Sequence, residues 1–347
     1  MSEGPGAWHE KWQEDRPVPH FPPPPQLSPR VGPLRRVPPA IFSALLGALG
    51  LGLAWRTGAG GLGAPAGLIE SYMGAVSLLF AFALAAYAGK VALRPGVAAE
   101  DASTLPGRAG LAALAMCLMA EGAVLAPYAP SLGIVSLGVG TAGLLVLALA
   151  VLPKRLRGTD TAGPITPAMH LVFVGFILVP AAAVRLGIWE TILVPLIWYC
   201  ILAFLVIFAA TIRPLLSGEA PAALRPLHAI QLAPPSLAAS AAVLTGQLVL
   251  AVVALALASV IAAVLVLRAR WLTEAGFSGF WSAFTFPSAS FAGATILIGG
   301  AYGSPGVRLA GGVLLIAATV IVLPVVYRVM KLWASGALAA KTNAAIA

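Results

Sequence analysis

The sequence predicts an all-α membrane protein with ten transmembrane helices in five helical hairpins, and three observations lead to this fold class. The 347 residues are 60% hydrophobic and 10% charged, with a mean hydropathy of +0.95, which soluble domains do not reach. Uncharged apolar runs long enough to cross a bilayer recur along the chain. Successive runs also alternate in bulk. We therefore expect the odd-numbered helices, rich in small residues, to line a central pore, and the even-numbered helices to form an outer ring.

The ten predicted crossings follow one another with short loops between them. The uncharged run from His228 to Leu267 is too long for one crossing, and Thr245, Gly246 and Gln247 form the polar break at which it is divided. The crossings lie near residues 39–55, 66–89, 109–128, 131–152, 166–184, 189–212, 228–245, 247–267, 277–301 and 307–327.

The segments outside the crossings divide the chain into three parts. Residues 1–37 are polar and Pro-rich, cannot bury a core, and are predicted to form a disordered cytoplasmic arm. Residues 38–331 form the membrane domain, and 332–347 form a short cytoplasmic tail. The loops leave no room for a second soluble domain.

The distribution of basic residues orients the chain. Of the 21 Lys and Arg residues, all except Arg56, Arg185 and Arg308 fall on the same side of the predicted membrane as the N-terminus. Because Lys and Arg are retained in cytoplasmic loops, both termini are expected to be cytoplasmic. Orientation also explains the net charge of +9, so no nucleic-acid partner is implied. The expected location is a bacterial inner membrane.

Stripes of small residues on the odd-numbered segments predict the pore wall. Within 277–301, Gly279, Ser282, Phe286, Ser290 and Gly293 recur at steps of three or four and share one helical face. Such stripes also mediate close helix packing, but several helices with similar stripes are easier to place around a common axis. The predicted pore-lining residues are Ser43, Gly47, Gly50, Ala113, Cys117, Gly175, Ser236, Ser240, Ser282, Thr285, Ser290 and Gly293.

Proline and glutamate residues add local features to the odd-numbered segments. Pro180, Pro234 and Pro287 are predicted to kink their helices. Glu121 is the one acidic residue well inside a segment, and it is either a proton- or ion-coupling group or a protonated structural residue. No basic residue falls inside a predicted segment, so helix ends and hydroxyl groups would have to attract an anion.

Motifs for other functions are missing from the sequence. No His, Cys, Asp or Glu residues have the spacing of a metal site, and no H-E-x-x-H, G-x-S-x-G or Walker motif occurs. Neither an enzyme, a metal nor another cofactor is therefore expected.

Three sequence elements resemble the tellurite-resistance and C4-dicarboxylate transporter family, which includes bacterial TehA-like channels and the plant guard-cell slow anion channel. They are WSAFTFP at 281–287, LAPPS at 232–236, and PPAIFSALLGALGLGLAW at 38–55. The resemblance covers 38–331 and implies ten helices in five hairpins around a pore. It also implies a homotrimer and passage of small inorganic or dicarboxylate anions.

The resemblance assigns one residue directly and leaves two features open. The second Phe of the family's W-x-x-F-T-F-P element blocks the pore, which implies that Phe286 is the gate. Family members often carry a proline early in the first, third and fifth helices, where this sequence has Leu45, Met116 and Val172. Pore shape and substrate can therefore differ. The alternative to an anion channel is a proton-coupled C4-dicarboxylate or sulfite exporter that uses Glu121.

Overall fold

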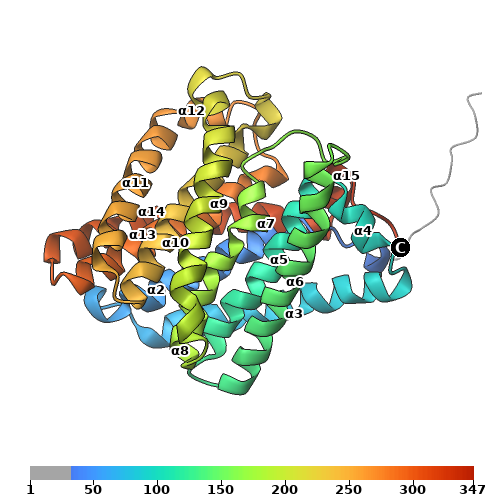
Figure 1. Ribbon diagram of the computed structural model, residues 1–347. Helices are drawn as coiled ribbons and strands as arrows, with labels where there is room; N and C mark the ends of the chain where they lie inside the picture. Colours follow the sequence, from blue (N-terminus) through green and yellow to red (C-terminus); the bar gives the residue numbers. More distant parts are fainter. Residues whose placement is uncertain (1–32) are drawn as a thin grey trace, which may run out of the picture. The chain divides into compact units, whose positions relative to one another are not determined.

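The predicted all-α membrane fold is confirmed by the structure, a computed structural model that describes residues 33–347. Within these residues no strand occurs, and nine helical stretches are long and apolar enough to cross a membrane. The fifth predicted crossing is instead made of three short pieces in succession (Figure 1). These are α7 (Met169–Phe173), the 3-10 turn η2 (Gly175–Leu178) and α8 (Val179–Leu186).

The long stretches fall into two groups that differ in burial. In each helix of one group, 72–78% of an apolar 18-residue stretch is buried inside the protein. In each helix of the other group, 28–33% of such a stretch is buried. The buried group consists of α2 (Ile41–Leu62), α5 (Leu105–Leu125), η3 (Ala222–Leu232) with α10 (Ala233–Leu244), and η4 (Gly279–Phe284) with α13 (Thr285–Ala301). The other group consists of α3 (Ala66–Leu93), α6 (Pro130–Leu156), α9 (Glu190–Ser217), α11 (Leu248–Leu267) and α14 (Pro305–Ala334).

The buried segments follow one another in a closed ring. Helix α2 contacts α5 and α13, α5 contacts α7 and α8, and α10 contacts η2, α8 and α13. Glycines allow the close approach: a Cβ atom at Gly47 would lie 2.0 Å from Thr285 Oγ1, and one at Gly110 would lie 2.2 Å from the carbonyl carbon of Pro39. Small residues at such contacts let membrane helices pack backbone to backbone. These segments therefore form the centre of the helical bundle.

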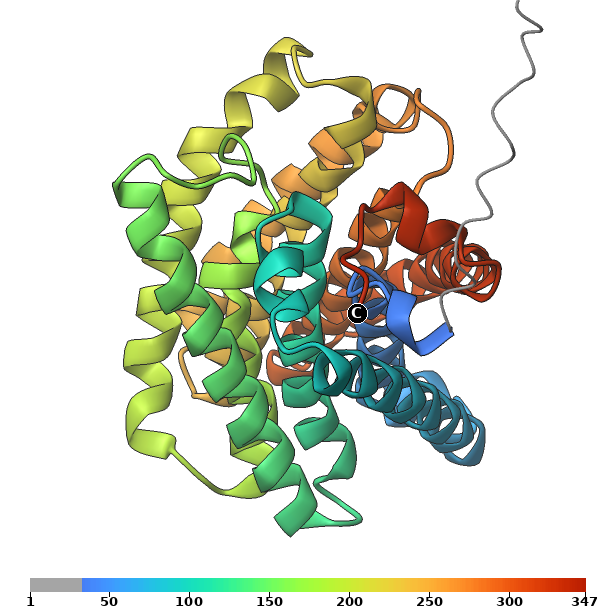
Figure 2. The ribbon, with the colours of Figure 1, turned by 90° about the vertical axis from the view of Figure 1, so that its right-hand side faces the viewer.

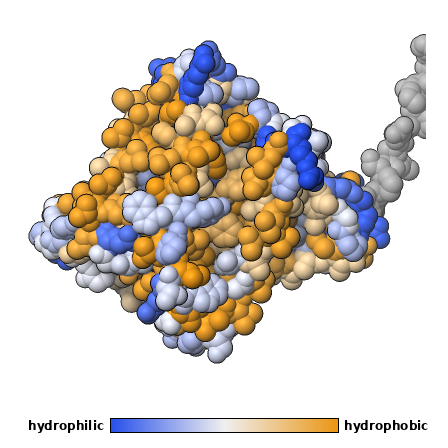
Figure 3. All heavy atoms as spheres, in the orientation of Figure 1, coloured by the Kyte–Doolittle hydropathy of each residue, from blue (hydrophilic) through white to orange (hydrophobic). Residues whose placement is uncertain are grey.

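The other five helices carry most of the exposed apolar side chains. Val146 on α6, Leu205 on α9 and Val249 on α11 are 67%, 48% and 80% exposed. Figure 3 shows a mostly hydrophobic face on one side of the molecule, with most of the hydrophilic residues near its margins. A bilayer is the environment in which such a surface is stable.

The three prolines predicted to kink helices lie where helix type changes. Pro180 and Pro234 occupy the first turn of α8 and α10, directly after η2 and η3. Pro287 is the third residue of α13, directly after η4. Proline is tolerated in a first helical turn because the N–H that it lacks has no partner there. The prolines thus coincide with the change from 3-10 to α-helix in three of the inner segments.

The start of the described chain is packed, although the sequence assigns it to the disordered arm. Residues 1–32 of that arm lie outside the described residues. The 3-10 turn η1 (Pro33–Arg36) precedes Val37, which is 3% exposed. The Val37 carbonyl oxygen accepts a hydrogen bond from Lys90 Nζ on α3 at 3.0 Å. The packed domain therefore begins before residue 38.

The tail is also packed and is joined to a buried ion pair. Lys90 Nζ lies 2.8 Å from Oδ2 of Asp101, a residue of the short helix α4 (Val97–Ala102), and both side chains are fully buried. Asp101 Oδ1 accepts a hydrogen bond from the backbone N–H of Ala345 at 2.9 Å. The N–H of Ala347 donates to the Arg35 carbonyl oxygen at 3.1 Å, which places the two ends of the described chain side by side (Figure 2).

Candidate functional site

Two cavities lie among the inner segments. The Ser282 cavity has a volume of about 130 Å³ and is lined by residues of α2, α5, η3, α10, η4 and the fifth segment. Ala40, Pro106 and Gly279, at or beside the first residues of α2, α5 and η4, all line it, so these three segments begin on the same side of the bundle. Its lining includes Ala40, Ser43, Ala109, Met116, Leu171, Gly175, Leu227, Ile230, Gly279, Ser282 and Pro287.

The second cavity, the Ser290 cavity, has a volume of about 70 Å³ and is lined by later residues of α2, α8, α10 and α13. Phe286 and Leu237 line both cavities. The two cavities therefore meet at these two side chains. The other residues of the lining are Gly50, Leu53, Ala54, Thr57, Leu178, Ala181, Arg185, Ser240, Leu244, Ala289, Ser290, Gly293 and Leu297.

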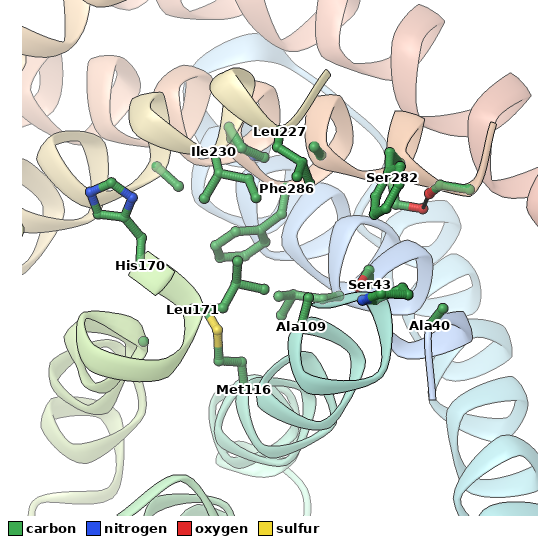
Figure 4. Close-up of a pocket in the computed structure, with 18 of the residues that line it drawn as sticks. Ala40, Ser43, Ala109, Met116, His170, Leu171, Leu227, Ile230, Ser282 and Phe286 are labelled. Atoms are coloured by element: carbon green, nitrogen blue, oxygen red, sulfur yellow. Dashed lines mark hydrogen bonds between the residues drawn. The ribbon is translucent and has the colours of Figure 1, made fainter. Parts of the chain in front are cut away.

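Phe286 is held tightly where the cavities meet. It is the second residue of α13 and is 6% exposed. A Cβ atom at Gly50 would lie 2.6 Å from Phe286 Cδ2, so only glycine at position 50 leaves room for the ring in this position. Figure 4 shows the ring among Leu171, Met116 and Ile230. The ring thus packs on α2 and faces apolar side chains of the Ser282 cavity.

Several of the predicted residues lie on these cavities. All five residues of the stripe from Gly279 to Gly293 are cavity-lining: Gly279, Ser282 and Phe286 on the Ser282 cavity, and Phe286, Ser290 and Gly293 on the Ser290 cavity. Of the other predicted residues, Ser43 and Gly175 line the Ser282 cavity, and Gly50 and Ser240 line the Ser290 cavity.

The structure brings the remaining five predicted residues to helix contacts and to neither cavity. Gly47 meets Thr285, whose hydroxyl donates to the Ser282 carbonyl oxygen at 2.7 Å. Ala113 is fully buried. The Cys117 thiol donates to the Phe42 carbonyl oxygen at 3.5 Å. The Ser236 hydroxyl is also fully buried and donates to the carbonyl oxygen of Leu232 at 2.7 Å.

Glu121 does not face either cavity. Ser77 on α3 donates a hydrogen bond to Glu121 Oε2 at 3.0 Å, and the residue is 5% exposed. The carboxyl group therefore lies between α5 and the outer helix α3. A residue that couples protons to transport has to exchange them with the pathway, and this position offers no such contact.

Arg185 is a cavity residue that the sequence analysis missed. The sequence analysis placed Arg185 in a loop, whereas in the structure it lies in the last turn of α8 and lines the Ser290 cavity. The hydropathy window for the fifth segment ended at residue 184, so this arginine was counted with the loop. Arg185 directly follows the end of this apolar window. That position was the sequence signal that could have identified it as a residue of the helix.

A third hollow, the Arg308 crevice, adjoins the Ser290 cavity. It has a volume of about 340 Å³ and shares Thr57 and Leu297 with the Ser290 cavity. Arg308, from the first turns of α14, also lines it. Arg185 therefore lines the Ser290 cavity, and Arg308 lines the crevice that adjoins it.

The Ser282 cavity is bordered by the C-terminal tail. Lys341, the last residue of α15 (Ala337–Lys341), and Thr342 line it, and Leu338 of the same helix is 1% exposed. His170 also lines this cavity, with its Nδ1 atom 2.9 Å from the Pro167 carbonyl oxygen. The tail predicted as a simple cytoplasmic extension thus forms part of the wall of the cavity.

The side chains around the cavities show which groups are present there. Among residues 33–347, no group of three or more His, Cys, Asp or Glu side chains is placed to hold a metal ion. The walls are mainly small and apolar side chains with a few hydroxyls, together with His170 and Lys341 in the Ser282 cavity and the two arginines. Together with the membrane-type surface, this arrangement defines an all-helical membrane protein of the channel or transporter class.

The comparison with protein families identifies the class more closely. Residues 36–330 match the voltage-dependent anion channel (SLAC1) family, and because the match covers most of the chain, the protein belongs to this family. The predicted relationship to the guard-cell slow anion channel and the TehA-like proteins is thereby confirmed. A search of curated proteins found no match.

Proposed function

We propose that the protein passes small anions across a bacterial inner membrane through the axis of its inner helices, and that Phe286 is the gate. The observation that carries this proposal is the position of Phe286 on both cavities. A bulky apolar ring at a junction of two small cavities closes the way for ions both sterically and by excluding water. The family to which the chain belongs supports anions as the passenger.

The proposed pathway leads from the cytoplasmic Ser282 cavity, past Phe286, to the Ser290 cavity and the Arg308 crevice. The excess of Lys and Arg in alternate loops supports the cytoplasmic position of the Ser282 cavity. The resemblance to trimeric family members supports a homotrimer with one pathway per subunit. The light-scattering mass of the purified protein in detergent tests that assembly.

The test of the gate is the Phe286→Ala variant in liposomes. Removing the ring joins the two cavities, so chloride flux should rise at least tenfold above wild type. The matched control is Phe291→Ala on the same helix, which deletes an equally buried ring that lines neither cavity. Each substitution is expected to reduce stability by about 3–5 kcal/mol. Equal flux in the wild type and the Phe286→Ala variant would refute the gate.

Coupling through Glu121 is not part of this proposal, because its carboxyl group is hydrogen-bonded to Ser77 away from both cavities. A channel of this kind should pass anions without a pH gradient. Flux measured with and without such a gradient distinguishes it from a proton-coupled exporter.

A further inference from the structure

The Ser290 cavity contains one charged side chain. Among the described residues that line it, Arg185 is the single acidic or basic group, and the other residues are apolar, glycine or hydroxyl-bearing. A cavity of about 70 Å³ has space for several water-sized groups. It can therefore hold a small ion together with part of the hydration shell of that ion.

The hydroxyl groups of this cavity are already used as donors. Thr57, Ser240 and Ser290 each donate to a backbone carbonyl oxygen three or four residues earlier on the same helix, at 2.9, 3.2 and 3.0 Å. A hydroxyl has a single proton to donate. In this arrangement the hydroxyls offer lone pairs to the cavity, and lone pairs do not bind an anion.

The guanidinium group of Arg185 has donors to spare. It donates to the Ala181 carbonyl oxygen at 2.5 Å, and no carboxylate lies within ion-pair distance of it in the described part of the chain. An arginine carries five N–H groups and is always charged, so most of its donors and its full charge remain available. Arg56 is different, because Glu70 neutralises it across two hydrogen bonds.

We propose that Arg185 binds a small monovalent anion in the Ser290 cavity, beside Phe286 and on the side away from the Ser282 cavity. This inference rests on the proposed function and identifies the residue that makes the pathway selective for anions. One guanidinium balances one negative charge, whereas a dianion would keep an uncompensated charge between apolar walls, which is costly. The Arg308 crevice gives this site a positively charged approach from outside the bundle.

The test measures selectivity in liposomes in the Phe286→Ala background, where the ring no longer limits flux. Replacing Arg185 with Gln should raise the half-saturating chloride concentration about tenfold and shift the reversal potential toward that of potassium. The Arg185→Lys variant keeps the charge and should keep the selectivity for chloride over potassium. Chloride and nitrate should permeate better than malate when Arg185 is present, and this preference should shrink in Arg185→Gln.

Two further variants separate the possible outcomes. Arg270→Gln on α12 (Ala269–Leu272) removes the same charge from a residue that is exposed, as Arg185 is, but lines none of the three cavities, and it should leave selectivity unchanged. Arg185→Cys should lose chloride selectivity and regain it after labelling with an ammonium-bearing thiol reagent; the native cysteines, Cys117 and Cys200, are buried. If Phe286→Ala liposomes pass no anion, the proposed function fails. If they pass anions with the same selectivity in Arg185→Gln, only the anion site is refuted.

Discussion

The contact between Gly50 and Phe286 leads to a prediction about the position of the Phe286 ring, the proposed gate. In a Gly50→Ala variant, the new methyl group would lie 2.6 Å from Phe286 Cδ2 and 2.9 Å from Cε2, while its distance to the Ala289 Cβ atom, 3.8 Å, is ordinary contact. Carbon atoms pack at about 3.5–4.0 Å. The ring must therefore move by about 1 Å or change rotamer.

The expected energies follow from this overlap. Crowding in a packed core costs about 1–3 kcal/mol, and alanine is favoured over glycine in a helix by about 1 kcal/mol. Gly50→Ala should thus be neutral or destabilising by up to about 2 kcal/mol in the wild type. In the Phe286→Ala background the overlap is absent, so the same change should stabilise the protein by about 1 kcal/mol. The expected coupling is about 1–3 kcal/mol.

A double-mutant cycle measures this coupling from thermal unfolding in detergent, and chloride flux of the four proteins gives a second readout. Gly50→Ala should change flux in the wild type and leave it unchanged in the Phe286→Ala background. Gly293→Ala adds a methyl group to the same cavity at an ordinary 3.4 Å from Ala54 Cβ. Gly52→Ala overlaps Met73 Cγ by a similar amount on the far side of α2. Additive energies for Gly50 and Phe286, or coupling as large for Gly52, would refute the assigned contact.

Three further predictions concern ionic groups and the tail. Asp160→Asn should reduce stability by about 2 kcal/mol at pH 7, because two hydrogen bonds from Arg108 lower the pKa of Asp160 to about 2. This stabilisation is present above the unfolded-state pKa of about 4 and is lost as the pH falls toward 2, so the denaturation curves of variant and wild type should converge on acidification. Lys90→Met leaves Asp101 buried without its cation and should cost about 3–5 kcal/mol, measured by thermal unfolding in detergent. Deleting 337–347 should raise chloride flux, because this segment borders the Ser282 cavity. Unchanged flux would show that the tail does not restrict the passage of chloride.

The division into inner and outer helices could be predicted from the sequence, because the inner helices are rich in small residues and the outer helices in bulky ones. Helices that touch neighbours on all sides need small residues, and helices that face lipid do not. The stripe from Gly279 to Gly293 illustrates this, since all five of its residues line the cavities. The assignment of Phe286 needed more than periodicity: it came from the family element around it.

Periodicity does not report every local feature of the predicted residues that line neither cavity. The start of the ninth segment is the 3-10 stretch η4, with about three residues per turn, and Thr285, which follows it, turns toward Gly47. Arg185 was not included among the predicted cavity residues because its charge ended the apolar window. In the structure its side chain bends back along α8 and donates a hydrogen bond to the Ala181 carbonyl oxygen.

The polarity of the pathway also differs from what the composition implies. The sequence places serine and threonine along the inner helices, and these residues read as a weakly polar wall. In the structure their hydroxyl protons are given to carbonyl oxygens of their own helices, as for Ser240, Ser282 and Ser290, so the wall provides few donors. Lys341, Arg185 and Arg308 are the Lys and Arg residues that line the three hollows, and Arg185 is the one in the Ser290 cavity beside Phe286, so the proposed pathway would concentrate its selectivity there. An apolar ring beside such a site is an effective closure, because moving it changes both the width of the passage and whether water can fill it.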